Sequence, residues 1–180
     1  MVEQRITLYD KIFELYISEE TVVGAISRIA DELRRDMEGL NPLFVGILNG
    51  AYLFVAELMC RLPSSYEITF AKYSSYQGTK SAGIVQEILP IKSDDKDRPV
   101  IILEDVIDSG LTMQYVTNRL REEGVKDVRV AAMLLKPKSL QCDFKPDYVG
   151  LEIENDFIVG FGLDYNGSGR TSRNIYKIVL

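Results

Sequence analysis

Residues 100–112 read VIILEDVIDSGLT, and this stretch decides the fold. Its first four residues, 100–103, are apolar and predict a strand that is buried on both faces. The glycine in the loop that follows predicts a turn into a helix over about 112–123, and residues 128–135 form the next apolar strand. Strand, short loop, helix and strand make a βαβ unit, which predicts a parallel sheet covered by helices.

The segments on either side of this unit continue the pattern. Apolar residues recur at helical spacing after Ser18, and Glu19 and Glu20 predict a capped, acidic first turn. Further strands are expected at 43–48, 68–73, 84–89, 148–153 and 157–161, and an apolar helix at 49–62. The chain, 1–180, is therefore expected to be one α/β domain. Its sheet is open, twisted, mostly parallel and flanked by helices, with a small flap or hood built from terminal segments.

The composition narrows the chemistry. The chain contains no histidine, which excludes Ser-His-Asp nucleophiles and histidine-ligated zinc or haem. Any metal site must be built from oxygens, which suits Mg²⁺ or Ca²⁺. The formal net charge of -6 argues against nonspecific binding of nucleic acid. No apolar stretch approaches the roughly 20 residues of a bilayer crossing, so no membrane partner is expected.

The cysteine count bears on the compartment. Cys60 and Cys142 are the two cysteines of the sequence, too few for a disulfide framework and too far apart for a CxxC site. Free thiols are typical of a reducing environment. The start of the sequence lacks a secretory pattern. A cytoplasmic protein is therefore expected.

The loop at 104–112 carries the candidate chemistry. In an open α/β sheet, ligands bind beyond the carboxyl ends of the strands, and this loop lies at such an end. Free amides at the helix entry, two hydroxyls and the helix dipole predict a phosphate cradle. The three carboxylates of the loop would repel a phosphate unless a cation or ligand hydroxyls lie between them.

Other interpretations stand beside this one. The loop could be a Walker B strand, although no GxxxxGK[ST] precedes it, or the acidic pocket of a receiver domain, or a solvated acidic turn. The polar segment 74–83, SSYQGTKSAG, is either disordered or a functional lid. Taken alone, Lys136 and Arg170 are typical surface charges, and Phe157 is a typical core residue.

Several motifs taken together resemble a known family. VIILEDVIDSGLT resembles the signature of the type I phosphoribosyltransferases, and the wider chain resembles their hypoxanthine(-guanine) branch from about residue 12 to 178. The further motifs stand in the family's order: Leu48-Asn49-Gly50 as the first pyrophosphate loop, Ser75-Tyr76 in the mobile lid, Lys136 as the purine-reading lysine, FIVGFGLDYN at 157–166 as the purine-stacking segment, and Arg170 six residues after Asp164.

The resemblance implies how phosphoribosyl pyrophosphate would be held. Glu104 and Asp105 would hold the ribose 2- and 3-hydroxyl groups and the associated Mg²⁺, and Asp164 would bind a second Mg²⁺. The backbone from Asp108 to Thr112 would bind the 5-phosphate. The implied substrate-binding set is completed by Asn49, Gly50, Ser75, Tyr76, Ser109, Gly110, Leu111, Thr112 and Arg170.

The resemblance also implies how the base would be read. Asp108 would accept the proton of purine N7, Lys136 would donate to the 6-oxo group, Phe157 would stack on the ring, and the backbone near Ile158 would read its other edge. Because a lysine only donates, it favours a 6-oxopurine over adenine. The implied reaction belongs to purine salvage and converts hypoxanthine, and also guanine, to IMP or GMP with release of pyrophosphate. A xanthine-preferring transferase, or a catalytically silent sensor of phosphoribosyl pyrophosphate or purine, is the alternative.

Two departures from the family and one assembly hypothesis complete the expectations. Many members have lysine at the position of Asn49, and some have lysine at the position of Leu111. Charged side-chain contacts with the pyrophosphate and the 5-phosphate are therefore in question. The peptide that enters the first loop is cis in some members, and the sequence leaves both forms of Leu48–Asn49 open. A homodimer or homotetramer is expected, because Tyr52, Leu53 and Met59 lie outside the apolar stripe of the 49–62 helix.

Overall fold

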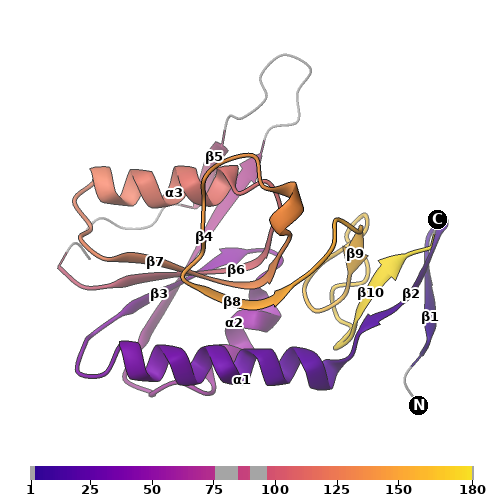
Figure 1. Cartoon of the computed structure of the whole chain (residues 1–180), viewed down its shortest axis with the longest axis horizontal. Helices are drawn as coiled ribbons and strands as arrows, with labels where there is room; N and C mark the ends of the chain where they lie inside the picture. The colour runs from indigo at the N-terminus through magenta and orange to yellow at the C-terminus, as the bar shows by residue number, and fades with distance from the viewer. Residues whose placement is uncertain (1–2, 76–84, 90–96, 180) are drawn as a thin grey trace.

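The computed structural model describes residues 3–75, 85–89 and 97–179 and consists of a large sheet between helices, with a smaller sheet at one end (Figure 1). The large sheet has six strands in the order β5-β4-β3-β6-β7-β8. Their bounds are β3 (Leu43–Leu48), β4 (Glu67–Ser75), β5 (Val85–Leu89), β6 (Val100–Ile107), β7 (Val128–Leu135) and β8 (Tyr148–Glu152). All neighbours pair in parallel except β4 and β5. The expected open, mostly parallel sheet is confirmed.

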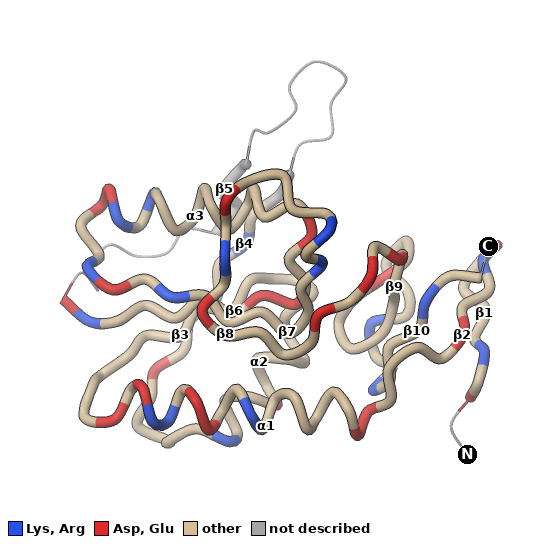
Figure 2. Tube along the Cα trace, viewed as in Figure 1, with Lys and Arg blue, Asp and Glu red and all other residues tan. Residues whose placement is uncertain are grey.

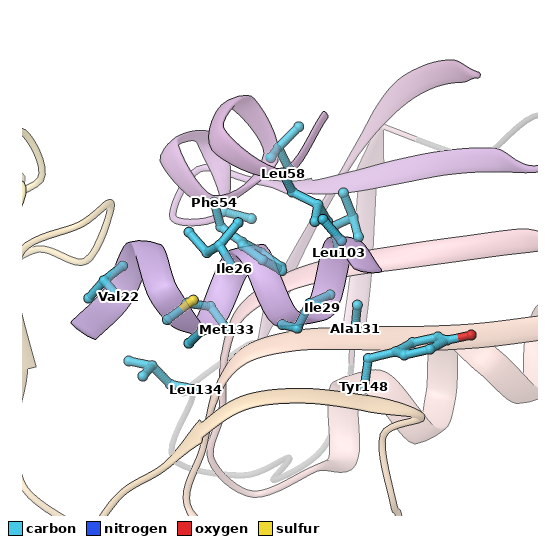
Figure 3. Packing of buried hydrophobic residues seen from close by; sticks show 14 of the residues in the cluster. Val22, Ile26, Ile29, Phe54, Leu58, Leu103, Ala131, Met133, Leu134 and Tyr148 are labelled. Atoms are coloured by element: carbon cyan, nitrogen blue, oxygen red, sulfur yellow. The ribbon is translucent and has the colours of Figure 1, made fainter. Parts of the chain in front are cut away.

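Both faces of this sheet are covered. Helices α1 (Glu19–Asp36) and α2 (Tyr52–Met59) pack on one face, and α3 (Leu111–Glu122) packs on the other. Along β6, Ile101 and Leu103 belong to the first cluster, whereas Val100 and Ile102 belong to the second. This alternation explains the continuous apolar run, because successive side chains of a strand point to opposite faces and both faces are buried here. Figure 3 shows the first cluster from close by.

Helix α1 forms as its sequence predicts. The side chain of Ser18 accepts a hydrogen bond from the backbone N–H of Thr21 at 3.3 Å, which satisfies one free amide of the first turn. Its apolar stripe is fully buried against the sheet, while acidic and basic residues alternate along its remaining surface (Figure 2). None of the helices in the described part of the chain is long and apolar enough to span a bilayer.

Several boundaries differ from the expectation. Strand β6 runs to Ile107, so Glu104 and Asp105 are strand residues and not loop residues, because their backbone continues the ladder with β7. Helix α2 covers Tyr52–Met59 and is shorter than the expected 49–62. Strand β4 extends through Ser75, because its last residues pair with β5. The rest of the expected lid, including Tyr76, lies outside the described residues.

The smaller sheet forms the expected hood. It has the order β1-β2-β10-β9 and is antiparallel throughout. Its strands are β1 (Arg5–Leu8), β2 (Lys11–Ile17), β9 (Ile158–Val159) and β10 (Ile175–Ile178). Phe13, Val159 and Tyr176 form its buried centre. Segments from both ends of the described chain therefore build one unit beside the large sheet (Figure 1).

The connections of the large sheet create a switch point between β3 and β6. From β3 the chain passes through α2 to β4 on one side, and from β6 it passes through α3 to β7 on the other side. The two strands are direct neighbours and run in parallel. Loops that leave their carboxyl ends therefore diverge, and the space between such loops is where open α/β sheets bind ligands.

Candidate functional site

A cavity of about 540 Å³ lies at this switch point. It is lined by the ends of β3 and β6, by the first turn of α3 and by the hood segment that follows β9. Tyr73, at the end of β4, also lines it. Ten of the predicted site residues meet here: Asn49, Gly50, Glu104, Asp105, Asp108, Ser109, Gly110, Thr112, Asp164 and Arg170.

Two adjacent carboxyl groups line the cavity at the end of β6. Burial raises the pKa of Glu104 well above its usual range, and the negative charge of Asp105 raises it further. Burial also raises the pKa of Asp105, although the N–H of Val106 donates to its Oδ1 at 2.7 Å and Arg170 lies near enough to oppose the shift. A pair of buried carboxyl groups with raised pKa values is suited to a cation or to ligand hydroxyl groups.

The carboxylate of Asp105 occupies the space above Gly50. Any side chain at position 50 would begin inside this carboxylate, so only glycine fits. The Leu48–Asn49 peptide before it is cis. On the other side, a Cβ at Gly162 of the hood would overlap the carbonyl oxygen of Gly50. The end of β6, the loop after β3 and the hood therefore meet in one close contact.

The loop after β6 has the geometry of an anion site. Gly110 adopts a left-handed conformation, with φ of 78°, directly before α3, and its carbonyl accepts the N–H of Gln114 at 2.9 Å. The amides ahead of Gln114 in the first turn have no acceptor within the helix, and that of Leu111 donates to Oγ of Ser109 at 3.4 Å. The Leu111 side chain is not among the cavity-lining residues and is 38% exposed. Position 111 can therefore contribute its backbone without a lysine.

Lys136 and Asp108 form an ion pair beside the cavity. Lys136 follows β7, its N–H donates to the carbonyl of Ile107 at 3.0 Å, and it is only 7% exposed. Its Nζ donates to Oδ2 of Asp108 at 3.0 Å, while the Asp108 side chain is 55% exposed. One buried donor and one accessible acceptor are thus presented side by side at the ends of adjacent strands.

The hood segment contributes a second ion pair. Nη2 of Arg170 lies 2.6 Å from Oδ1 of Asp164, and Nη1 of Arg170 donates to the carbonyl of Gly162 at 2.7 Å. The second oxygen of Asp164 accepts the N–H of Gly167 at 2.6 Å. The six-residue spacing between Asp164 and Arg170 therefore closes a tight turn that presents an acid and a base to the same cavity.

Of the remaining predicted residues, Phe157 and Ile158 are not among the residues that line the cavity. Phe157 is 47% exposed at the start of the hood segment, and Ile158 is buried in β9, where its backbone pairs with Lys177. Ser75 ends β4, and Tyr76 falls outside the described residues. The sequence analysis did not identify Gly162 or Tyr73. The position of Tyr73 near the carboxyl end of β4, beside β3, is the signal that could have found it.

Comparisons with known proteins agree with this geometry. Residues 17–166 match the family described as phosphoribosyl transferase domain. The chain is 40% identical over 163 residues to the hypoxanthine-guanine phosphoribosyltransferase of Lactococcus lactis, covering 89% of this chain and 88% of the relative. It is 38% identical over 159 residues to the protein of that name from Streptococcus mutans, covering 88% of each. A crystal structure of a hypoxanthine phosphoribosyltransferase from Staphylococcus aureus has a TM-score of 0.87 and 30% identity, covering 92% of this chain and 91% of that chain.

The raised pKa values of Glu104 and Asp105 predict that these two carboxyl groups lower the stability of the folded protein. Glu104→Gln should raise the Tm of the ligand-free protein, because it removes one of two like charges from a poorly solvated position. The gain should be on the order of 1 kcal/mol, or about 2–4 °C. The folded-state pKa values lie above those of the unfolded chain, so the unfolded chain binds fewer protons and stability falls as pH rises through the folded-state values. Thermal unfolding should therefore show a larger gain at pH 8 than at pH 5.

The control for this measurement is Glu122→Gln, which removes an exposed carboxylate from α3. It should change Tm by much less at either pH, because exposed charges contribute little to stability. An unchanged or lower Tm for Glu104→Gln at both pH values would contradict the proposed repulsion at the end of β6.

Proposed function

The chain belongs to the phosphoribosyltransferase family, and we propose that it transfers the 5-phosphoribosyl group of phosphoribosyl pyrophosphate to a 6-oxopurine. Hypoxanthine is the proposed acceptor, and guanine a second one, with IMP or GMP and pyrophosphate as products. The relatives from Lactococcus lactis and Streptococcus mutans, which cover most of the chain, carry the name hypoxanthine-guanine phosphoribosyltransferase. The enzyme would act in purine salvage.

The Lys136–Asp108 pair carries this proposal. The 6-oxo group of hypoxanthine accepts hydrogen bonds, and the adjacent N7–H donates one. Lys136 is a donor without acceptor capacity, and ionised Asp108 is an acceptor without donor capacity, so the two match that edge of the base. Adenine presents an amino group where hypoxanthine presents oxygen. Two donors would then face each other, which costs binding energy.

The reaction that follows from this arrangement is a displacement at the anomeric carbon. Purine N9 forms a bond to that carbon, the bond to the pyrophosphate oxygen breaks with its electron pair, and the N7 proton passes to Asp108. The loop from Asp108 to Thr112 would hold the 5-phosphate through backbone amides. Arg170 would stabilise the negative charge that grows on the departing pyrophosphate.

Magnesium fits the donor set of the cavity. Across the described residues, no group of three or more Cys, Asp and Glu side chains is arranged to hold a metal ion. Two neighbouring carboxyls do suit Mg²⁺, which is commonly bound through one or two carboxylates together with substrate phosphates and water. Glu104 and Asp105 would hold one ion with the ribose hydroxyls, and Asp164 a second. When bound, Mg²⁺ supplies neutralisation of the leaving pyrophosphate.

Residues 1–180 would act as one functional unit, because the cavity is lined by residues of both the large sheet and the hood.

The two cysteines are free thiols, which supports the proposed cytoplasmic location. The partners proposed for the chain are phosphoribosyl pyrophosphate, a 6-oxopurine and further copies of itself.

The first prediction from this function concerns the choice of base. With Mg²⁺ and phosphoribosyl pyrophosphate, pyrophosphate release should be efficient with hypoxanthine, present with guanine, and lower with adenine by on the order of 100-fold in kcat/KM. Xanthine belongs in the same assay, because the described contacts do not separate it from guanine. If adenine were used as efficiently as hypoxanthine, the role of Lys136 would be wrong. A protein that binds these ligands but releases no pyrophosphate would instead be a sensor.

The second prediction concerns Asp108. Asp108→Asn should lower kcat by about 100-fold or more, because an amide cannot take up the N7 proton. Binding of phosphoribosyl pyrophosphate should change little, because the loop holds the phosphate through its backbone. Steady-state kinetics and calorimetric titration with phosphoribosyl pyrophosphate measure the two effects separately. Loss of that binding in a folded variant would make Asp108 a ligand-holding residue.

The third prediction concerns assembly. Leu53 and Met59 of α2 pack against the core of their own chain, and the hydroxyl of Tyr52 donates to the carbonyl of Arg170 at 3.2 Å. Ile68 and Phe70 of β4 are more accessible apolar residues, at 38% and 37% exposed. Light scattering at micromolar concentration should give two or four times the 20.4 kDa of one chain. A monomer would refute the proposed oligomer.

The position of the interface is tested separately. Ile68→Lys combined with Phe70→Lys should give a folded monomer if β4 carries the contact, because two charges would enter an apolar interface. Circular dichroism establishes that the variant is folded. An unchanged oligomer would place the contact elsewhere.

A further inference from the structure

The ring of Phe157 belongs to an aromatic cluster in the hood. Its centroid lies 5.9 Å from that of Tyr165, with an interplanar angle of 86°, and 6.3 Å from that of Phe13. Phe13 and Tyr165 are themselves 6.1 Å apart. Edge-to-face contacts of this kind favour one ring orientation. Since Phe157 is 47% exposed and Phe13 is fully buried, the cluster supports Phe157 from one side and leaves the rest of the ring accessible.

The supporting ring of Tyr165 is held by the turn between β1 and β2. The hydroxyl of Tyr165 donates to Oδ1 of Asp10 at 2.8 Å, and the ring of Tyr9 lies edge-on to Tyr165 at 6.2 Å. The hydroxyl of Tyr9 also donates to the carbonyl of Asn166 at 3.3 Å. The hydrogen bond from Tyr165 lowers the pKa of Asp10, which keeps this carboxylate ionised as an acceptor.

This turn lies far from the proposed site residues in sequence. Asp10 and Tyr165 are 155 positions apart, and the family match begins only at residue 17. The turn lines no part of the cavity beside Asp108. Any effect of Asp10 on the base must therefore pass through Tyr165 and then Phe157.

We propose that the β1–β2 turn is a positioning element for the purine, in which the hydrogen bond from Tyr165 to Asp10 fixes the ring of Phe157 for stacking. The inference rests on the proposed function, in which Phe157 stacks on the base. Tyr165 and Asp10 are positioning residues in this proposal, because they would act on the base through Phe157. Loosening Tyr165 should therefore weaken base binding without changing the chemical step.

Tyr165→Phe is the sharpest test, because it keeps the supporting ring and removes only the hydroxyl. We expect the KM for hypoxanthine to rise about 3-fold to 10-fold, while kcat and the KM for phosphoribosyl pyrophosphate stay within about 2-fold. Tyr165→Leu also removes the edge-to-face contact and should raise the KM for hypoxanthine further. Asp10→Ala should resemble Tyr165→Phe and add little to it in the double variant, because both remove the same hydrogen bond.

The matched control is Glu14→Gln on β2. Like Asp10→Ala, it removes one negative charge from the hairpin of β1 and β2. The carboxylate of Glu14, however, pairs with Arg5 and Lys177, each at 3.8 Å. This variant should leave the KM for hypoxanthine unchanged. A similar rise in the control would mean that the charge of the hairpin, and not the hydrogen bond, is responsible.

Three further outcomes would count against the positioning role or against the proposed function. If Tyr165→Phe changed both KM values and kcat together and lowered Tm, the hydrogen bond would be a general anchor of the hood, and the proposal would be overturned. An unchanged KM for hypoxanthine in the folded variant would overturn it as well. A parent protein that transfers phosphoribosyl to no 6-oxopurine would instead refute the proposed function.

Discussion

The close contact of Asp105, Gly50 and Gly162 is the constraint on which the site depends. A side chain at either glycine would collide with the carboxylate or with the backbone beneath it. The contact sets how near the end of β6, the loop after β3 and the hood can approach one another. Because protein interiors are close-packed and transmit displacement, moving one of these segments would move the others, and with them the cavity.

Two adjacent buried carboxyl groups, those of Glu104 and Asp105, lie at this contact. Burial disfavours ionisation of Glu104 and Asp105, and the nearby Arg170 opposes the pKa shift of Asp105 without reversing it. A fold selected only for stability would not retain two adjacent carboxyls at such a position. The proposed ribose hydroxyl groups and Mg²⁺ would explain their presence, since each would be bound most strongly where water solvates the carboxylates least.

The sequence predicted what is local and left out what joins distant segments. The βαβ unit, the capped helix α1 and the carboxyls at the end of β6 follow from neighbouring residues, and the structure confirms them. The extension of β6 to Ile107 depends on pairing with β7, which residue types alone do not reveal. Likewise, the ion pair of Lys136 with Asp108 and the support of Tyr165 by Asp10 join residues 28 and 155 positions apart. Such contacts become visible only when the chain is folded.

The architecture separates two recognition tasks. In the proposed function, ribose binding, phosphate binding and proton transfer take place at the ends of parallel strands, where the backbone is fixed by ladders on both sides and by helices on both faces. Stacking on the base is assigned to the hood, whose four-stranded sheet is small and antiparallel. A chemical step requires positions held within fractions of an ångström, whereas stacking contributes binding energy and takes no part in bond making. The rigid sheet can therefore keep the chemistry constant, while changes in a peripheral hairpin tune how strongly the base is held.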